Sequence, residues 1–345
     1  MKKTLTEGVI SLLETFTYTL RAIVPILLTV LLGYTVRRVG SWKDDFYRQL
    51  NKLCFNLFLP LHLFCSVYAI SDLNAVNWTL LGYIFLAILL CAAMGLAAAK
   101  LLISRRDQQG VIMQCAFRSN QAILGLPLAQ SLGGDAAMAF AAVSTSLVVP
   151  LYNVLAVIVL TAFSGDGSKR HSAKELLRRV ATNPLIIGTL SALALVLIRQ
   201  LLPVVDGEPI FTIKSQMPAF FQTLTNLSKV GSPVMLFVLG ARLDFSAVKS
   251  LLPQLRLGIL LRLIGGPLVM IGGAILLREP LGLTTVTMPT LVAISATPVA
   301  TSSAVMTQEI GGDDQLASQL VVWTTTFSLV TIFCIVYLLR SFGFL

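Results

Sequence analysis

The residues whose types could do chemistry gather in one apolar segment, 109–131. Near its middle the run Arg-Ser-Asn occupies 118–120, and Pro127 follows within the same segment. A proline removes a backbone donor and clashes with the carbonyl four residues earlier, so it frees polar groups that hydrocarbon cannot satisfy. We therefore expect a broken or kinked helix here, with Pro127 marking the break.

A second apolar segment, 284–308, holds a matching irregularity around Pro298. Hydroxyl side chains surround this proline at Thr297, Thr301, Ser302 and Ser303. Two interrupted helices in corresponding places of the two halves of a chain indicate a substrate site near the membrane midplane, where half-helix ends direct partial charges at a solute. The alternative is that the prolines only kink their helices and the hydroxyl groups bond back to their own carbonyls.

Arg118 is the costliest residue of the chain if these segments cross a membrane, because an arginine at a helix centre costs roughly 2.5–3.5 kcal/mol. All sixteen carboxylates lie in connections or within a few residues of a segment end, so none is a convincing midplane partner. An anionic solute would complement such a cation, whereas snorkelling or bonds to released carbonyls would be a structural explanation of equal weight. The same distribution argues against a proton relay through a buried Asp or Glu.

These arguments give one set of candidate residues. The substrate-binding candidates are Arg118, Asn120, Thr297, Thr301 and Ser302, and the helix-break candidates are Pro127 and Pro298. We expect no catalytic residue and no metal site or cofactor, because the five cysteines lie in apolar segments without a CxxC motif and the two histidines are far apart.

Two further polar residues lie in apolar segments. Arg262 is nearer a segment end than Arg118, so we expect its side chain to snorkel in a structural role. Asn153 follows the kink expected at Pro150, and bonding to a neighbouring helix is the preferred interpretation over lining the same cavity.

The elements that must position these residues follow from composition. Of 345 residues, 56% are apolar and only 12% are charged, and the mean hydropathy is +0.83. A membrane-spanning helix needs about 20 apolar residues, so ten spans with short connections would use nearly the whole chain. The sequence predicts an all-α polytopic membrane protein with spans at 17–36, 50–70, 77–103, 109–131, 135–163, 183–203, 217–241, 254–277, 284–308 and 315–341.

Charge placement predicts an orientation. The net charge of +10 comes from short Lys and Arg clusters between apolar segments, which argues against a nucleic-acid surface. Most of them follow odd-numbered spans, including the linker 164–182, so the positive-inside rule places this linker in the cytoplasm and both termini outside. The opening residues 1–16 are interrupted by polar side chains and predict a short interfacial helix rather than a cleavable signal.

A repeat relates the two halves, 1–163 and 183–345. The stretch QSLGGDAAMAFAAV from Gln130 matches QEIGGDDQLASQLV from Gln308 at six of fourteen positions, five spans apart. A repeat with an odd number of spans must enter the membrane from opposite sides in its two copies, which predicts the inverted pseudo-symmetry of secondary transporters. Chance similarity among apolar helices is the alternative.

Several stretches resemble the auxin efflux carrier family of permeases in a bacterial-type form, from about Pro25 to the carboxyl end. They are FRSNQAILGLPLAQSLGG, VPLYNVLAVIVL, NPLIIG, SPVMLFVLGARL and ATPVATSSAVMTQEIGGDDQLASQLVVWTT. The resemblance implies two inverted five-helix repeats with broken, crossing helices 4 and 9. It also implies a scaffold of helices 1, 2, 6 and 7, a mobile transport domain of helices 3–5 and 8–10, and elevator-type transport of organic anions such as malate or malonate.

By motif, Asn120 and Pro127 match the family's helix 4 asparagine and crossing proline, and Pro298 matches a helix 9 proline. The chain departs from plant members at Ser303, where they have a second proline, and in its short linker 164–182, so auxin is not the expected solute. We expect a secondary transporter for a mono- or dicarboxylate in the cytoplasmic membrane. An anion channel and a sodium-coupled symporter are the alternatives, and a homodimer through the scaffold helices is compatible with the resemblance.

Overall fold

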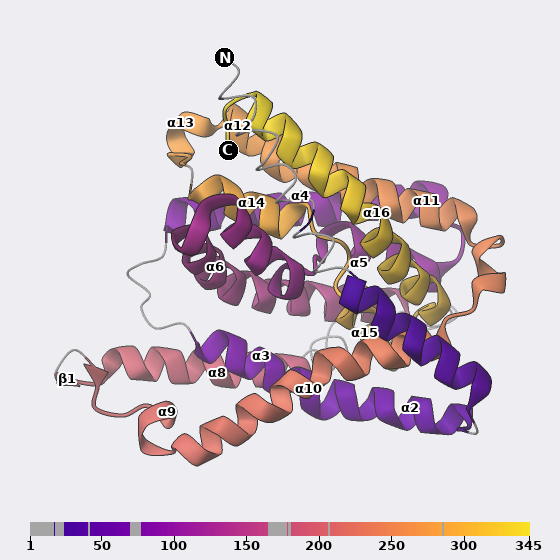
Figure 1. Cartoon of the computed structure of the whole chain (residues 1–345), viewed down its shortest axis with the longest axis horizontal. Helices are drawn as coiled ribbons and strands as arrows, with labels where there is room; N and C mark the ends of the chain where they lie inside the picture. Colours follow the sequence, from indigo (N-terminus) through magenta and orange to yellow (C-terminus); the bar gives the residue numbers. More distant parts are fainter. Residues whose placement is uncertain are drawn as a thin grey trace.

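The structure is a computed structural model that describes residues 24–40, 42–69, 77–164, 181–205, 208–284 and 286–345, together with Thr17 and Arg178. Helices make up most of it (Figure 1). Within the described ranges, strands are confined to a hairpin of β1 (Val204–Val205) and β2 (Glu208–Pro209). The interfacial helix expected over 1–16 and most of the linker 164–182 lie outside the described residues.

Within the residues that the structure describes, seven helical stretches are long and apolar enough to cross a membrane, which supports an all-α polytopic membrane protein. Large apolar side chains such as Leu201 and Leu276 are about 85% exposed on them, as expected where lipid is the solvent. The seven stretches are Asp44–Tyr68 (α2 Asp44–Leu53, η1 Cys54–Phe58, α3 Leu59–Tyr68), α4 Trp78–Leu102, Gln121–Phe163 (η2 Gln121–Gly125, α6 Leu126–Phe163), α8 Pro184–Leu201, α10 Pro218–Arg242, Leu252–Leu276 (α11 Leu252–Leu260, η4 Leu261–Gly265, η5 Leu268–Gly272, α12 Gly273–Leu276) and α16 Asp314–Ser341.

The remaining helices are shorter. They are the unlabelled helix over 24–39, α5 Arg106–Phe117, α9 Ile213–Gln216, the 3-10 turn η3 Phe245–Val248, α13 Arg278–Leu281, α14 Thr287–Ser295 and α15 Ser302–Ile310. Three of them, α5, α14 and α15, fall in the two segments for which the sequence predicts interrupted helices.

The two Gly-Gly-Asp motifs both turn the chain between helices. α6 bends at Gly134, where φ is 71°, and this separates 126–132 from a long helix that runs to Phe163. In the second half, Gly311 (φ 94°) ends α15 in the left-handed conformation, which glycine adopts without a Cβ clash. The motif therefore turns the chain in both halves, with the positive φ on its second glycine in the first half and on its first glycine in the second half.

The helices form two layers in Figure 1. The lower layer contains the indigo helix over 24–39 with α2, α3, α8 and α10, and α3 packs against both α8 and α10. The upper layer contains α4, α5, α6, α11, α14 and α16. Within the lower layer the first helix meets α10 backbone to backbone, since a Cβ built on Gly33 would lie 2.0 Å from the Phe237 carbonyl oxygen.

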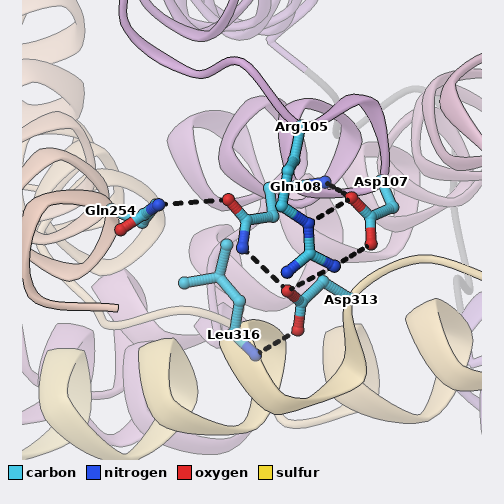
Figure 2. Close-up of polar contacts among 6 residues, drawn as sticks. All are labelled: Arg105, Asp107, Gln108, Gln254, Asp313 and Leu316. Atoms are coloured by element: carbon cyan, nitrogen blue, oxygen red, sulfur yellow. Dashed lines mark hydrogen bonds and ion pairs between the residues drawn. The ribbon is translucent and has the colours of Figure 1, made fainter. Parts of the chain in front are cut away.

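A polar cluster ties together the starts of three helices of the upper layer, α5, α11 and α16 (Figure 2). We call it the α5 entry cluster: Arg105, Asp107, Gln108, Gln254 and Asp313. Arg105 pairs with both Asp107 and Asp313, and Gln108 donates to the Asp313 carboxylate at 2.9 Å. Asp313 also caps α16 by accepting from the Leu316 amide at 2.9 Å. The hydrogen bond to Asp107 raises the pKa of Arg105 above its ordinary value.

Candidate functional site

The first predicted interruption is real but lies earlier in the chain than expected. α5 ends at Phe117, residues 118–120 are not helical, and the π-helical turn η2 begins at Gln121. Pro127 lies inside a continuous helical run, because Gly125 and Leu126, where η2 passes into α6, both keep helical dihedral angles. The prediction that Pro127 marks the break therefore needs correction.

The second interruption separates α14, which ends at Ser295, from α15, which begins at Ser302. Pro298 lies inside this break. The hydroxyls of Ser295 and Thr297 donate to carbonyls one turn back, Leu291 at 2.6 Å and Ala293 at 3.1 Å. Part of the hydroxyl content of this segment thus serves its own backbone.

The two breaks cross and pair with each other. Ser119 and Val299 form an antiparallel bridge, in which the Asn120 amide donates to the Pro298 carbonyl at 2.8 Å and the Ala300 amide donates to the Arg118 carbonyl at 3.3 Å. This pairing supplies partners for backbone groups that the broken helices release. Close approach depends on Gly125, because a Cβ there would lie 2.6 Å from the Ala293 carbonyl oxygen.

A cavity of about 70 Å³ lies beside this crossing, between the two layers. The lower layer contributes α3 and α10, and the upper layer contributes the two breaks and α6. The polar side chains that line it are His62, Ser66, Arg118, Ser119, Asn120, Gln121, Thr145, Tyr152, Asn153, Ser232, Thr301 and Ser302. The arrangement brings polar groups from both halves of the chain to one point.

Arg118 is buried in this cavity with neutral partners. Its Nη2 donates to the Asn153 Oδ1 and to the Ser302 Oγ, both at 2.9 Å, and its Nη1 contacts the Met306 sulfur. Among the ion pairs of the described residues none includes Arg118. The guanidinium charge is therefore solvated by neutral groups only, which leaves it electrostatically available to an anion.

Several other lining side chains have polar atoms that are buried and unpartnered. They are the amide nitrogens of Asn120, Gln121 and Asn153, the Gln121 Oε1 and the Thr145 hydroxyl. Buried polar atoms are nearly always hydrogen-bonded in folded proteins, so a group of them around one cavity needs an explanation. A polar solute that hydrogen-bonds to these atoms would explain why they have no partner within the protein.

Four of the five predicted site residues line the cavity: Arg118, Asn120, Thr301 and Ser302. Thr297 is absent from the described lining, and its hydroxyl donates to the Ala293 carbonyl. The sequence reasoning missed Gln121, Thr145 and Tyr152, and it favoured a packing role for Asn153, which both bonds Arg118 and lines the cavity. Val149, Tyr152 and Asn153 follow Thr145 at the spacing of a single helix face, and this spacing is visible in the sequence.

The expectation that the Arg262 side chain snorkels is wrong, whereas its contacts are structural as expected. Its side chain is only 2% exposed and bonds backbone carbonyls at the crossing instead of reaching a membrane surface.

The described residues contain no group of three or more His, Cys, Asp or Glu side chains that could hold a metal ion.

Comparison with known proteins bears on what such a crossing is for. The pattern of the family described as "Membrane transport protein" matches residues 18–336, almost the whole chain. The chain belongs to this family. The resemblance to auxin efflux carriers is thereby confirmed, and the chain is a multi-pass membrane transport protein. A relative from Rhizobium meliloti (strain 1021), named "Putative malonate transporter", is 25% identical over 334 residues, which cover 92% of this chain and 95% of the relative.

Proposed function

We propose that this transport protein is a secondary transporter that carries a small organic anion, a mono- or dicarboxylate, through the cavity at the crossing. One observation carries the proposal: the buried Arg118 guanidinium has only neutral partners and stands among unpartnered polar atoms of Asn120, Gln121 and Asn153. A carboxylate would offset the desolvation of the arginine and accept from the free amide donors. The name of the Rhizobium relative supports a short dicarboxylate as the solute class.

The proposed architecture is ten spans in two inverted repeats, with helix 4 formed by α5, η2 and the first part of α6, and helix 9 by α14 and α15. The paired breaks and the two Gly-Gly-Asp turns support it, because each feature occurs once in each half. We take the lower layer as a fixed scaffold in the cytoplasmic membrane and the upper layer as the moving domain of an elevator. The cavity lies between them, as a site that changes its accessible side must.

A thermal-shift comparison tests the solute class. Purified protein is melted with malonate, succinate or acetate, and with malonamide as the neutral isostere of malonate. A ligand of the native state raises the melting temperature, so a carboxylate should do so and malonamide should not. Uptake of labelled malonate by proteoliposomes then tests transport. If no carboxylate stabilises the protein more than malonamide does, the anion proposal fails.

A further inference from the structure

A second buried arginine at the crossing makes contacts of a different kind from those of Arg118. Arg262 lies in the π-helical turn η4, and among the fully buried side chains it is the largest. Its Nε donates to the Thr297 carbonyl at 3.0 Å. Its Nη1 donates to the carbonyls of Ala116 and Phe117 at 3.4 and 3.2 Å, and its Nη2 to those of Ile294 and Ser295 at 3.2 and 2.6 Å.

These contacts use the whole donor capacity of the side chain. A guanidinium group carries five N–H donors, and Arg262 makes five contacts with carbonyl oxygens. No donor is left for a solute. Arg262 is also absent from the described residues that line the cavity, so its charge acts on the backbone alone.

The carbonyls that Arg262 binds belong to the carboxyl ends of both half-helices. Ala116 and Phe117 end α5, Ile294 and Ser295 end α14, and Thr297 lies in the second break. The last carbonyls of a helix have no partner within it, and each helix end carries a partial charge of about −0.5. Two such ends sum to about −1, which one guanidinium neutralises.

In many carriers, carbonyls at the ends of discontinuous helices are where a coupling cation such as Na⁺ is coordinated. Here the carbonyl oxygens at the helix ends surround the guanidinium of Arg262, which belongs to η4. We propose that Arg262 is a built-in cation, a positioning residue that holds the two half-helix ends together in place of a dissociable ion. This inference rests on the proposed carrier function and specifies its coupling, since solute movement then requires no bound Na⁺.

The two arginines have different roles in this arrangement: Arg262 binds backbone carbonyls, and Arg118 lines the cavity. Arg118 directly follows Phe117, so the carbonyl anchored by Arg262 is adjacent in the chain to the residue that faces the cavity. Because the helix ends neutralise Arg262, its charge does not compete with Arg118 for an anion. Fixing the break in this way sets where Arg118 and Asn120 stand.

The first test measures thermal stability of the purified protein without any solute. The wild type should melt at the same temperature in sodium chloride and in N-methyl-D-glucamine chloride of equal concentration. Arg262→Lys and Arg262→Met keep stems of similar length, and only lysine keeps the charge, so the lysine variant should melt several degrees above the methionine variant. Arg256→Ala is the matched control, because Arg256 is an exposed arginine in the same span.

The second test is chemical rescue. Arg262→Ala should gain a few degrees of melting temperature from millimolar guanidinium chloride relative to N-methyl-D-glucamine chloride, while wild type and Arg256→Ala should not. Selective stabilisation of the wild type by Na⁺, a methionine variant as stable as the lysine variant, or an alanine variant indifferent to guanidinium would each overturn the proposal. None of these measurements uses an organic anion, so failure of the proposed solute class would be seen separately in the malonate experiments.

Discussion

At the cavity, Arg118 and Asn120 differ in what the protein already gives them. Arg118 has three neutral contacts, whereas the amide nitrogen of Asn120 has no partner. The Arg118 guanidinium is therefore fixed by the protein, whereas the Asn120 amide nitrogen is free to donate to a solute. Substitutions at the two positions should therefore have separable effects on binding and on folding.

Arg118→Ala should weaken binding of malonate, used as the probe anion, by about 1.5–3 kcal/mol, because a hydrogen bond to a charged group is lost. This corresponds to a roughly ten-fold or greater rise in the dissociation constant, measured by calorimetry. Arg118→Lys, which keeps the charge, should bind more tightly than the alanine variant. Normal anion binding by Arg118→Ala together with misfolding of Arg118→Lys would show that the arginine is structural.

Asn120→Ala should abolish stabilisation by malonate while leaving expression and the solute-free melting temperature close to those of the wild type. The side-chain amide nitrogen has no partner in the folded protein, so its removal leaves no acceptor unpaired. Asn226→Ala is the control, because Asn226 is exposed on α10 and pairs with Gln222. A large loss of stability in Asn120→Ala alone would point to a folding role instead.

At the scale of elements, the crossing depends on backbone proximity between η2 and α14. Gly125→Ala would place a Cβ 2.6 Å from the Ala293 carbonyl oxygen, so we expect destabilisation by about 1–3 kcal/mol, as for other overpacked sites. Gly82→Ala in α4 is the matched control, because nothing lies within 4 Å of its Cβ and alanine favours a helix. Unfolding monitored by circular dichroism compares them, and equal stabilities would contradict the packing seen at the crossing.

The α5 entry cluster offers a comparison between the two halves. Asp313 joins Arg105, Gln108 and the start of α16, whereas its repeat counterpart Asp135 accepts from Gln130 at an exposed position. Asp313→Ala should therefore lower stability by about 1–2 kcal/mol through the lost cap, and Asp135→Ala by clearly less. Melting curves of the two variants decide this, and an inverted order would mean that the cluster contributes nothing.

At the scale of the whole molecule, the apolar pattern predicts membrane-spanning helices and the charges predict their orientation. Cysteine introduced at Lys3 should react with a membrane-impermeant reagent added outside intact cells, and cysteine at Ser172 should not. Both positions lie outside the described residues, so the expectation comes from the Lys and Arg distribution alone. Labelling at 172 and protection at 3 would invert the topology.

The sequence could predict a polytopic membrane protein because lipid solvation demands long apolar runs, and those runs are visible residue by residue. It could not place the first break, since that break is set by pairing of Ser119 with Val299, a contact between segments 180 residues apart. It misjudged Arg262 for a similar reason. The partners of Arg262 are main-chain carbonyls of α5 and α14, and any sequence provides those.

The joint between the first helix and α10 has a consequence for how such a protein can diversify. A Cβ at Gly240 would lie 1.8 Å from the Val30 carbonyl oxygen, and one at Gly33 would meet Phe237 in the same way. No residue with a Cβ fits at either glycine. In a mutational library selected for folded protein, we therefore expect every substitution at these two positions to be depleted. Neither glycine lines the cavity, so the cavity residues can change during evolution, and with them the solute preference, while this joint stays the same.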